Sequence, residues 1–302
     1  MLIGGIEAGG TKIVCAVGTT PNNIEAKTTF PTKSPSETLL EIKRFFSRYE
    51  LNSIGVGSFG PIDLDKSSKT YGKILNTPKL NWRNYNLLEQ LKEDYSIPVY
   101  INTDVNIACL SEYYQGAGKN VNSCLYITIG TGIGAGFVKN GEIYQGTSHP
   151  EMGHIYIPKH PKDSFNGSCP YHKSCLEGLG SGTSIKKRHG KTGEDLTKEG
   201  FVWELESYYL AHAIVNYSFI LSPERIILGG GVMKQNNLYP LIRKKVSCLI
   251  NNYVNNVNDM ENFIMPPVLN DEQGVKGAIQ LAINQREREG KSHLKHKTKQ
   301  YF

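Results

Sequence analysis

The chain has 302 residues, 39% of them hydrophobic and 21% charged, a composition that excludes disordered, fibrous and membrane-spanning classes of protein. A single core seldom grows beyond about 250–300 residues, so this length favours two domains. No apolar run reaches the roughly 18 residues of a membrane span, and the first residues lack the basic and apolar regions of a secretory signal. We therefore expect a cytoplasmic protein with no membrane partner.

The formal net charge of +6 is concentrated at one end of the chain. The segment 285–302 holds six Lys or Arg residues and two Glu residues, which gives it a charge of +4. A basic face for nucleic acid is therefore not indicated, and no nucleic-acid partner is expected. Such a basic end is typical of a solvated terminus, and we expect this tail to be disordered.

Strand and helix signals open the chain. Apolar runs at 2–6 and 13–17 flank a glycine turn, which predicts two strands joined by a tight turn. Ser34 is followed three residues later by Glu37 in a capping box, and apolar residues then recur at helical spacing as far as Tyr49. A helix is therefore expected over this stretch.

The rest of the first half predicts a further strand, then a strand that runs directly into a helix. These elements are expected at 54–57, 98–101 and 105–114. Asp104 would thus stand at a strand-to-helix junction. The glycine pair at Gly116 and Gly118 then marks the expected end of the first domain.

The opening pattern returns in the second half. A strand at 124–129, a glycine turn and a strand at 135–138 are followed by a long helix at 203–221 and a strand at 225–228. This repetition predicts a duplicated α/β fold. The domains expected are 1–117 and 118–284, with the final helix at about 274–284 able to return to the first lobe.

The glycine loops do not match the common nucleotide-binding motifs. Gly10-Thr11-Lys12 has the wrong residue order for a P-loop. The loop at 130–135 fits a loose dinucleotide pattern, but a strand follows it where that motif needs a helix. Each loop still offers backbone N–H groups and a threonine hydroxyl, Thr11 or Thr131, to an anion.

Five motifs stand in a fixed order along the chain: Gly5–Lys12, Thr103–Asn106, Ile129–Gly134, Glu151–His154 and Leu228–Val232. Together they resemble the motifs of the ROK family of sugar kinases, and within it those of the bacterial zinc-containing fructokinases. The resemblance extends from residue 3 to about residue 283.

The resemblance implies an actin-like, ribonuclease H-like fold of the hexokinase type with two lobes, a homodimer, and transfer of the γ-phosphoryl group of ATP, with Mg²⁺, to a sugar hydroxyl. It also implies nucleotide-binding residues of two kinds. Those at the phosphates are Gly9, Gly10, Thr11, Lys12, Gly130, Thr131 and Gly132. Those against the adenosine are Gly229, Gly230 and Gly231.

Phosphoryl transfer needs a carboxylate to accept the proton of the attacking hydroxyl, and Asp104 is the candidate general base. The competing interpretation is that Asp104 merely caps the following helix. The resemblance also implies a set of sugar-binding residues: Gly60, Thr103, Glu151, His154 and Glu177.

Two positions depart from the wider family and favour fructose, with fructose 6-phosphate as the product. Glu7 replaces the usual Asp, and Thr103 replaces the Asn of glucose and hexosamine kinases. A kinase for glucose, mannose or an N-acetylated hexosamine is the alternative. A sugar-sensing repressor is disfavoured, because the first strand begins at Leu2 and leaves no room for a DNA-binding domain.

Cys169, His172 and Cys175 form a C-x₂-H-x₂-C pattern, and His154 lies fifteen residues upstream. Four sulfur and nitrogen ligands with no open position are typical of structural Zn²⁺. Such an ion would hold the loop that carries Glu177 and orient the imidazole of His154. Because the glycine loops lie elsewhere in the sequence, ATP binding is expected to depend little on the zinc.

Overall fold

The computed structural model describes residues 1–254 and 259–299, with side chains through residue 291. The chain forms two compact units. The first comprises residues 1–115, 145–149 and the chain from residue 269 on, and the second comprises residues 116–144 and 150–268. Among the helices within these described ranges, none is long and apolar enough to cross a membrane.

The first unit is built on a five-stranded sheet in the order β3-β2-β1-β4-β5, antiparallel from β3 to β1 and parallel from β1 to β5. Its strands are β1 (Leu2–Ala8), β2 (Lys12–Thr20), β3 (Asn23–Pro31), β4 (Leu51–Ser58) and β5 (Val99–Thr103). Its helices are α1 (Pro35–Phe46), η1 (Leu80–Trp82), α2 (Leu87–Tyr95), α3 (Asp104–Gln115) and α9 (Gln273–Lys299).

The predicted elements of this unit are present, with two differences. Helix α1 ends at Phe46, where the cap Ser47 bonds back to Lys43, so Tyr49 lies beyond the helix. Strand β3 was not predicted, because its residues alternate between exposed and half-buried and none of them is buried. The capping box is confirmed, since the backbone N–H of Ser34 donates to Oε2 of Glu37 at 3.3 Å.

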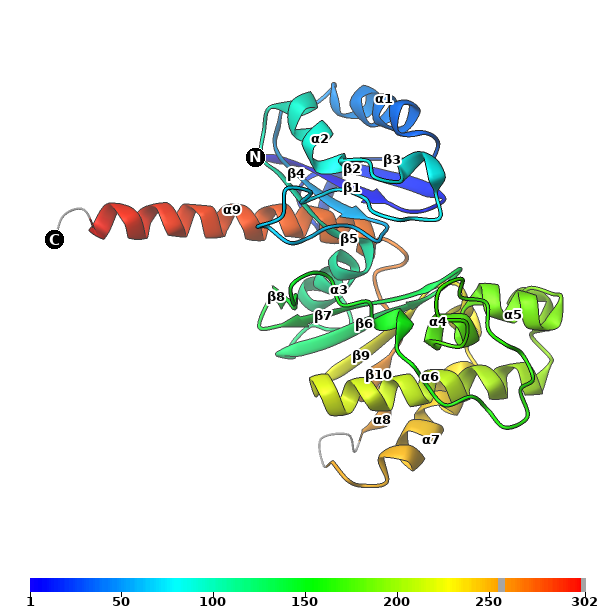
Figure 1. Cartoon of the computed structure of the whole chain (residues 1–302). Coiled ribbons are helices and arrows are strands. Elements are labelled where there is room, and N and C mark those ends of the chain that lie inside the picture. Colours follow the sequence, from blue (N-terminus) through cyan, green and yellow to red (C-terminus); the bar gives the residue numbers. More distant parts are fainter. Residues whose placement is uncertain (255–258, 300–302) are drawn as a thin grey trace. The chain divides into compact units, whose positions relative to one another are not determined.

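Helices cover both faces of this sheet, with α1 and α2 on one face and α3 and α9 on the other (Figure 1). Helix α9 lies directly on β4, because a Cβ atom at Gly55 would overlap the carbonyl group of Ala278. Helix α9 also continues to Lys299, whereas the sequence predicts a disordered tail over 285–302. Residues 300–302 of that tail lie outside the described residues. The residues of 285–289 are good helix formers and extend an already packed helix.

The second unit repeats this topology. Its sheet has the order β8-β7-β6-β9-β10, antiparallel from β8 to β6 and parallel from β6 to β10. The strands are β6 (Ser123–Ile129), β7 (Ile133–Lys139), β8 (Glu142–Ile143), β9 (Arg225–Gly229) and β10 (Ile264–Met265). The helices are η2 (Met152–His154), α4 (Leu176–Gly180), α5 (Gly182–His189), η3 (Gly193–Leu196), α6 (Gly200–Leu221), η4 (Val232–Lys234), α7 (Leu238–Ile250) and α8 (Met260–Phe263). The matching strand order confirms the predicted duplication.

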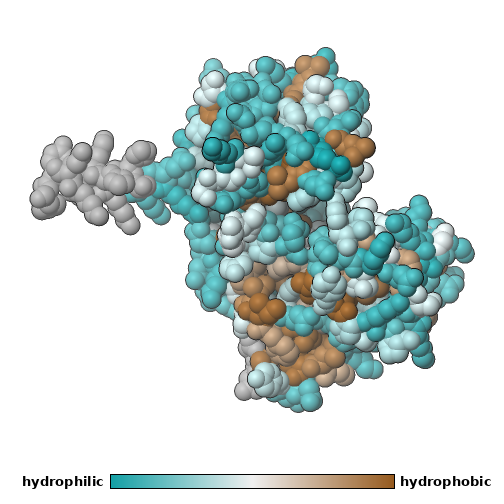
Figure 2. Space-filling view, in the orientation of Figure 1, coloured by the Kyte–Doolittle hydropathy of each residue, from teal (hydrophilic) through white to brown (hydrophobic). Residues whose placement is uncertain are grey.

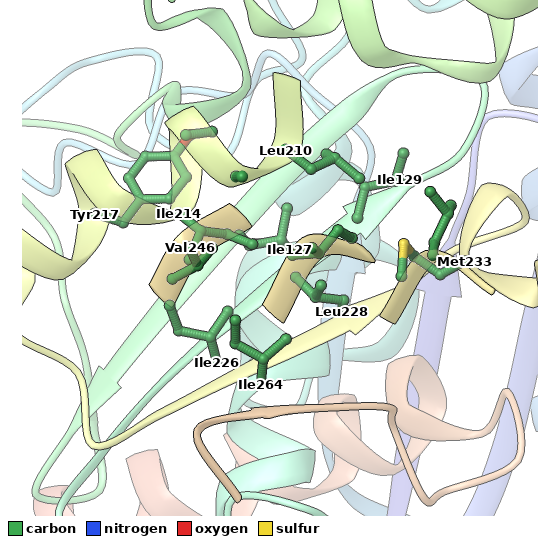
Figure 3. Packing of buried hydrophobic residues seen from close by; sticks show 14 of the residues in the cluster. Ile127, Ile129, Leu210, Ile214, Tyr217, Ile226, Leu228, Met233, Val246 and Ile264 are labelled. Carbon is green, nitrogen blue, oxygen red and sulfur yellow. The ribbon is translucent and has the colours of Figure 1, made fainter. Parts of the chain in front are cut away.

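The core of the second unit lies between its sheet and two helices. Aliphatic side chains of β6, β9 and β10 meet those of α6 and α7, as Figure 3 shows for Ile127, Leu228 and Ile264 against Ile214 and Val246. Each of these side chains is at most 2% exposed. This packing fixes the strands whose ends carry the candidate site residues.

Candidate active site and metal centre

Three neighbouring strands of the first unit end at one edge of the sheet. Ala8 of β1 pairs with Ser58 of β4, and Ser58 pairs with Thr103 of β5. Since these strands are parallel, the segments that follow them start at the same edge, where ligands commonly bind in such sheets. The structure thus brings Gly9, Gly60 and Asp104 together at the end of one sheet.

The first glycine turn is tightly closed. The N–H of Gly9 donates to the carbonyl oxygen of Lys12 at 3.0 Å, and a Cβ atom at Gly9 would lie only 2.8 Å from that oxygen. Thr32 braces the turn by donating its N–H to Thr11 O at 2.9 Å and its hydroxyl to Gly9 O at 2.8 Å. Thr11 and Lys12 are exposed and Gly10 is half-buried, so the turn is accessible to a ligand.

Asp104 is the first residue of α3, but another residue caps this helix. Oγ1 of Thr103 accepts a hydrogen bond from the N–H of Asn106 at 3.2 Å, which is the geometry of an N-cap. Oδ1 of Asp104 accepts from the adjacent N–H of Val105 at 2.8 Å. The observed capping by Thr103 removes the main reason to regard Asp104 as a helix cap.

The same arrangement limits what Thr103 can do. The residue is 4% exposed and one lone pair of its hydroxyl oxygen already accepts from Asn106, so the hydroxyl proton and the second lone pair remain for a ligand. At Gly60, by contrast, an added Cβ atom would come no nearer than 3.5 Å to other protein atoms. The packing of the protein therefore does not require a glycine at that position.

In the second unit, a glycine segment follows each of two neighbouring parallel strands, β6 and β9. Thr128 of β6 pairs with Gly229 of β9, so the turn at 130–132 and the segment 229–231 begin at one edge of the sheet. The N–H of Gly130 donates to Gly132 O at 2.9 Å, and no protein atom lies within 4 Å of a Cβ atom built at Gly130 or Gly231. Both segments leave room for a ligand beside the backbone.

Two carboxylates and an imidazole of the predicted sugar set lie together in this unit. Nε2 of His154 is 4.0 Å from Oε1 of Glu177. Glu151 interacts electrostatically with both: desolvation raises the pKa of its carboxyl, His154 lowers this pKa, and Glu177 raises it. Oε2 of Glu177 also accepts from the N–H of Ile133 at 3.0 Å, a contact that the sequence did not predict.

The four predicted metal ligands converge. The ligand atoms of His154, Cys169, His172 and Cys175 all lie within 4.8 Å of one another. Nδ1 of His154 is 3.5 Å from Sγ of Cys175 and 3.8 Å from Sγ of Cys169, which is 3.7 Å from Nδ1 of His172. Bond lengths of about 2.3 Å to sulfur and about 2.0 Å to nitrogen give tetrahedral ligands a separation of about 3.5 Å. The donor set and its spacing therefore fit Zn²⁺.

The cluster is held by a short loop. The N–H of Lys173 donates to Cys169 O at 3.1 Å, and Lys173 has a φ of 54°. Gly167, with a φ of 92°, lets the backbone pass close to the carbonyl group of Lys173. His154 turns Nδ1 toward the sulfur atoms, which leaves Nε2 facing Glu177.

The sequence predicted no role for three polar residues that meet at the first turn of α3. Asn102, Asn106 and His149 form a hydrogen-bonded group at the start of α3. For the two asparagines the available signal was their place next to Thr103 and Asp104 at a strand-to-helix junction, where buried amides need specific partners. No local signal pointed to His149.

Comparison with known proteins places these features in one family. The model of the ROK family matches residues 3–285. The chain is 50% identical to a "Putative fructokinase" of Bacillus subtilis over 93% of this chain and 95% of that one. It is 41% identical to a "Fructokinase" of Pediococcus pentosaceus over 93% of this chain and 98% of that one.

Solved structures support the fold. The ROK hexokinase of Thermus thermophilus matches with a TM-score of 0.79 at 23% identity, over 95% of this chain and all of that one. This likeness confirms the predicted hexokinase-type fold class. With a family model that matches nearly the whole chain, the predicted resemblance is also confirmed: the protein belongs to the ROK family.

Proposed function

We propose that this chain is an ATP-dependent fructokinase, which transfers the γ-phosphoryl group of ATP to the 6-hydroxyl of D-fructose. Support comes from the similarity over nearly the full chain to proteins named fructokinase. The observation that carries the mechanism is the position of Asp104, at the edge where β1, β4 and β5 end, with the capping role taken by Thr103.

In this proposal Asp104 is the general base. Its half-buried carboxylate accepts the proton of the sugar hydroxyl as that oxygen attacks the γ-phosphorus, and the bond from phosphorus to the β-γ bridging oxygen breaks. The position at the end of a buried strand fixes the carboxylate before the sugar arrives, so little reorganisation is needed during the reaction.

The glycine turns hold the nucleotide. The N–H groups and threonine hydroxyls of 9–12 and 130–132 bind phosphate oxygens, and 229–231 lie against the adenosine. Mg²⁺, when bound with ATP, neutralises phosphate charge. Gly130 and Gly231 leave the space that such close backbone approach needs.

The cysteine–histidine cluster would hold a structural Zn²⁺ through His154, Cys169, His172 and Cys175. Two sulfur and two nitrogen donors at the observed spacing fit this ion and fill all four of its positions. Such an ion would stabilise the loop that leads into α4 and would fix the ring of His154, whose Nε2 is directed at Glu177.

For the sugar, we propose contacts from Glu151, His154 and Glu177, with the backbone at Gly60 and the hydroxyl proton of Thr103. The alternative substrates are glucose, mannose and N-acetylated hexosamines. A coupled assay of ADP release across a panel of hexoses tests the proposal, and fructose should give the highest kcat/KM. A higher value for another hexose would assign the chain to that sugar instead.

We also propose that the protein is a homodimer, formed through the second unit. Phe219, Ile220 and Tyr253 are 48%, 76% and 82% exposed, and the rings of Phe219 and Tyr253 lie 5.9 Å apart. Figure 2 shows hydrophobic residues gathered on this unit, and such patches commonly mark interfaces. Light scattering on Ile220→Lys should give the monomer mass where the unaltered protein gives the dimer mass.

A further inference from the structure

The first turn of α3 carries a buried chain of hydrogen bonds that ends on a histidine. Oδ1 of Asn102 accepts from the N–H of Thr103 at 2.9 Å and from Nδ2 of Asn106 at 2.7 Å. Nδ2 of Asn106 also lies 3.2 Å from Nδ1 of His149. Asn102 is 8% exposed and Asn106 is 1% exposed, so these groups depend on one another for partners.

This chain of bonds fixes the orientation of each amide. A backbone N–H can only donate, so the atom of Asn102 that faces Thr103 N must be the oxygen. The atom of Asn106 at 2.7 Å from that oxygen must then be its NH₂ group. The second hydrogen of this NH₂ group points at Nδ1 of His149, which therefore accepts.

A neutral imidazole that accepts at Nδ1 carries its proton on Nε2. The ring of His149 is half-buried, and burial lowers its pKa to about 4, so the ring is neutral near pH 7. Within the described residues, Nε2 makes no hydrogen bond and is not among the buried polar atoms that lack a partner. His149 thus presents a single neutral N–H donor at the surface.

The neighbours of this donor indicate its ligand. Asn106 lies in the first turn of α3, as Asp104 does, so its partner His149 lies at the same end of the sheet as that carboxylate. The segment 145–149 is anchored to the same unit by a bond from Nε2 of Gln145 to Leu64 O at 3.2 Å. A neutral donor suits the oxygen of an uncharged hydroxyl better than a phosphate, which is bound more strongly by charged groups.

We propose that His149 is a specificity-determining residue, which donates its Nε2–H to one hydroxyl oxygen of the hexose held beside Asp104, and that Asn106 positions it for this role. This inference rests on the proposed sugar kinase function. A site built to bond one hydroxyl rejects analogues that lack it, because the donor is then left without its partner.

The test compares two substitutions at His149. His149→Leu keeps the approximate volume but removes the donor, and kcat/KM for fructose should fall by about 10- to 100-fold, mainly through KM. His149→Gln can accept from Asn106 through Oε1 and donate through Nε2, so it should restore part of that loss. His212→Leu is the control, because that half-buried histidine bonds the carbonyl of Tyr208 within α6.

A set of fructose analogues, each lacking one hydroxyl other than the 6-hydroxyl that accepts the phosphoryl group, separates recognition of the sugar from support of the fold. For one analogue, His149→Leu should cause no further loss, because the bond is already absent, while the other analogues keep the full effect of the substitution. Equal losses with every analogue, or unchanged kinetics in a folded His149→Leu protein, would overturn the proposal.

Failure of the proposed function gives a different result. If the unaltered protein prefers another hexose, fructokinase activity is wrong, and the same comparison with deoxy analogues of that hexose decides the role of His149. If His149→Leu has lost its thermal transition, the comparison of His149→Gln with the unaltered protein across the analogues decides it. If no hexose is phosphorylated, both proposals are wrong.

Discussion

Glu177 links the cysteine–histidine loop to the second glycine turn, because its Oε2 atom accepts a hydrogen bond of 3.0 Å from the N–H of Ile133. Gly132 makes room for this carboxylate, since a Cβ atom there would overlap Oε2 of Glu177. From the sequence alone, ATP binding is expected to depend little on the metal loop. Through this contact, a change in the position of the metal loop would change the position of the glycine turn.

Metal analysis of the purified protein should find about one Zn²⁺ per chain, because the cluster provides two sulfur and two nitrogen ligands, which fill all four coordination positions of the ion. Chelation should lower the melting temperature and weaken the binding of both fructose and ATP, since Glu177 connects the loop to the turn. Calorimetry before and after chelation measures these changes. Cys248→Ser, at an exposed cysteine, should leave them unchanged.

The ligand assignment has its own check. Cys169→Ser and Cys175→Ser each remove one sulfur donor, and each variant should lose most of its zinc. A variant that keeps a full complement of zinc would exclude its cysteine as a ligand. Zinc-free protein that binds fructose with unaltered affinity would contradict the proposed coupling between the metal and the sugar.

Asp104→Asn should lower kcat by roughly 10²–10⁴-fold, because the amide cannot accept the proton of the attacking hydroxyl. The melting temperature should barely change, since Thr103 provides the cap of α3. Steady-state kinetics with a thermal melt measure both. Thr103→Ala should instead act mainly on stability, with a loss of about 1 kcal/mol in the free energy of unfolding. Near-normal turnover in Asp104→Asn would exclude it as the base.

The ratio of kcat/KM for fructose to that for glucose should be well above one. The oxygen of Thr103 is already bonded to Asn106, so this position lacks the amide with which Asn would read a sugar hydroxyl. Measurement with each sugar over a range of concentrations gives the ratio. A Thr103→Asn variant that gains efficiency with glucose would support this explanation, whereas equal efficiencies in the unaltered protein would contradict it.

The part of the free energy of unfolding that depends on Glu206 should fall as the pH rises from about 5 to about 8. Glu206 is 1% exposed, neither of its carboxyl oxygens has a hydrogen-bond partner among the described residues, and burial raises its pKa to about 8. The folded state therefore holds a proton that the unfolded chain has released, and stability is lost across that interval. A shift of one pKa unit corresponds to about 1.4 kcal/mol.

Glu206→Gln should remove this part of the pH dependence. Denaturant titrations at the two ends of the interval should show a smaller difference for the variant than for the unaltered protein. Glu204→Gln is the matched control, because Glu204 lies two residues before Glu206 in α6 and its partly exposed carboxylate pairs with Lys245 of α7. Parallel pH profiles for Glu206→Gln and the unaltered protein would show that Glu206 does not titrate in this range.

Local patterns were sufficient to predict the framework of the fold. The glycine-turned strand pairs, the capping box at Ser34 and the junction at Asp104 depend on residues close in sequence, and the structure has all of them. The strand β3 escaped prediction because an exposed edge strand has no buried face to impose an apolar period. The start of α6 at Gly200 rather than Trp203 is a difference of less than one turn.

Contacts between segments far apart in the sequence could not be predicted from local patterns. The bond from Ile133 N to Glu177 joins residues 44 positions apart, and that from Asn106 to His149 spans 43. Neither pair has a local spacing that would reveal it. The cysteine–histidine cluster was predictable because three of its four ligands lie within a seven-residue stretch, where the chemistry of the donors limits the alternatives.

The division of roles at the start of α3 separates chemistry from architecture. Thr103 caps the N-terminus of the helix, and the side chain of Asn106 bonds to Asn102, so the carboxylate of Asp104 contributes little to the stability of this junction. A substitution at that single position removes the proton acceptor while the surrounding surface keeps its shape. In an enzyme arranged in this way, one amino-acid substitution gives a receptor, which binds the sugar and leaves it unaltered.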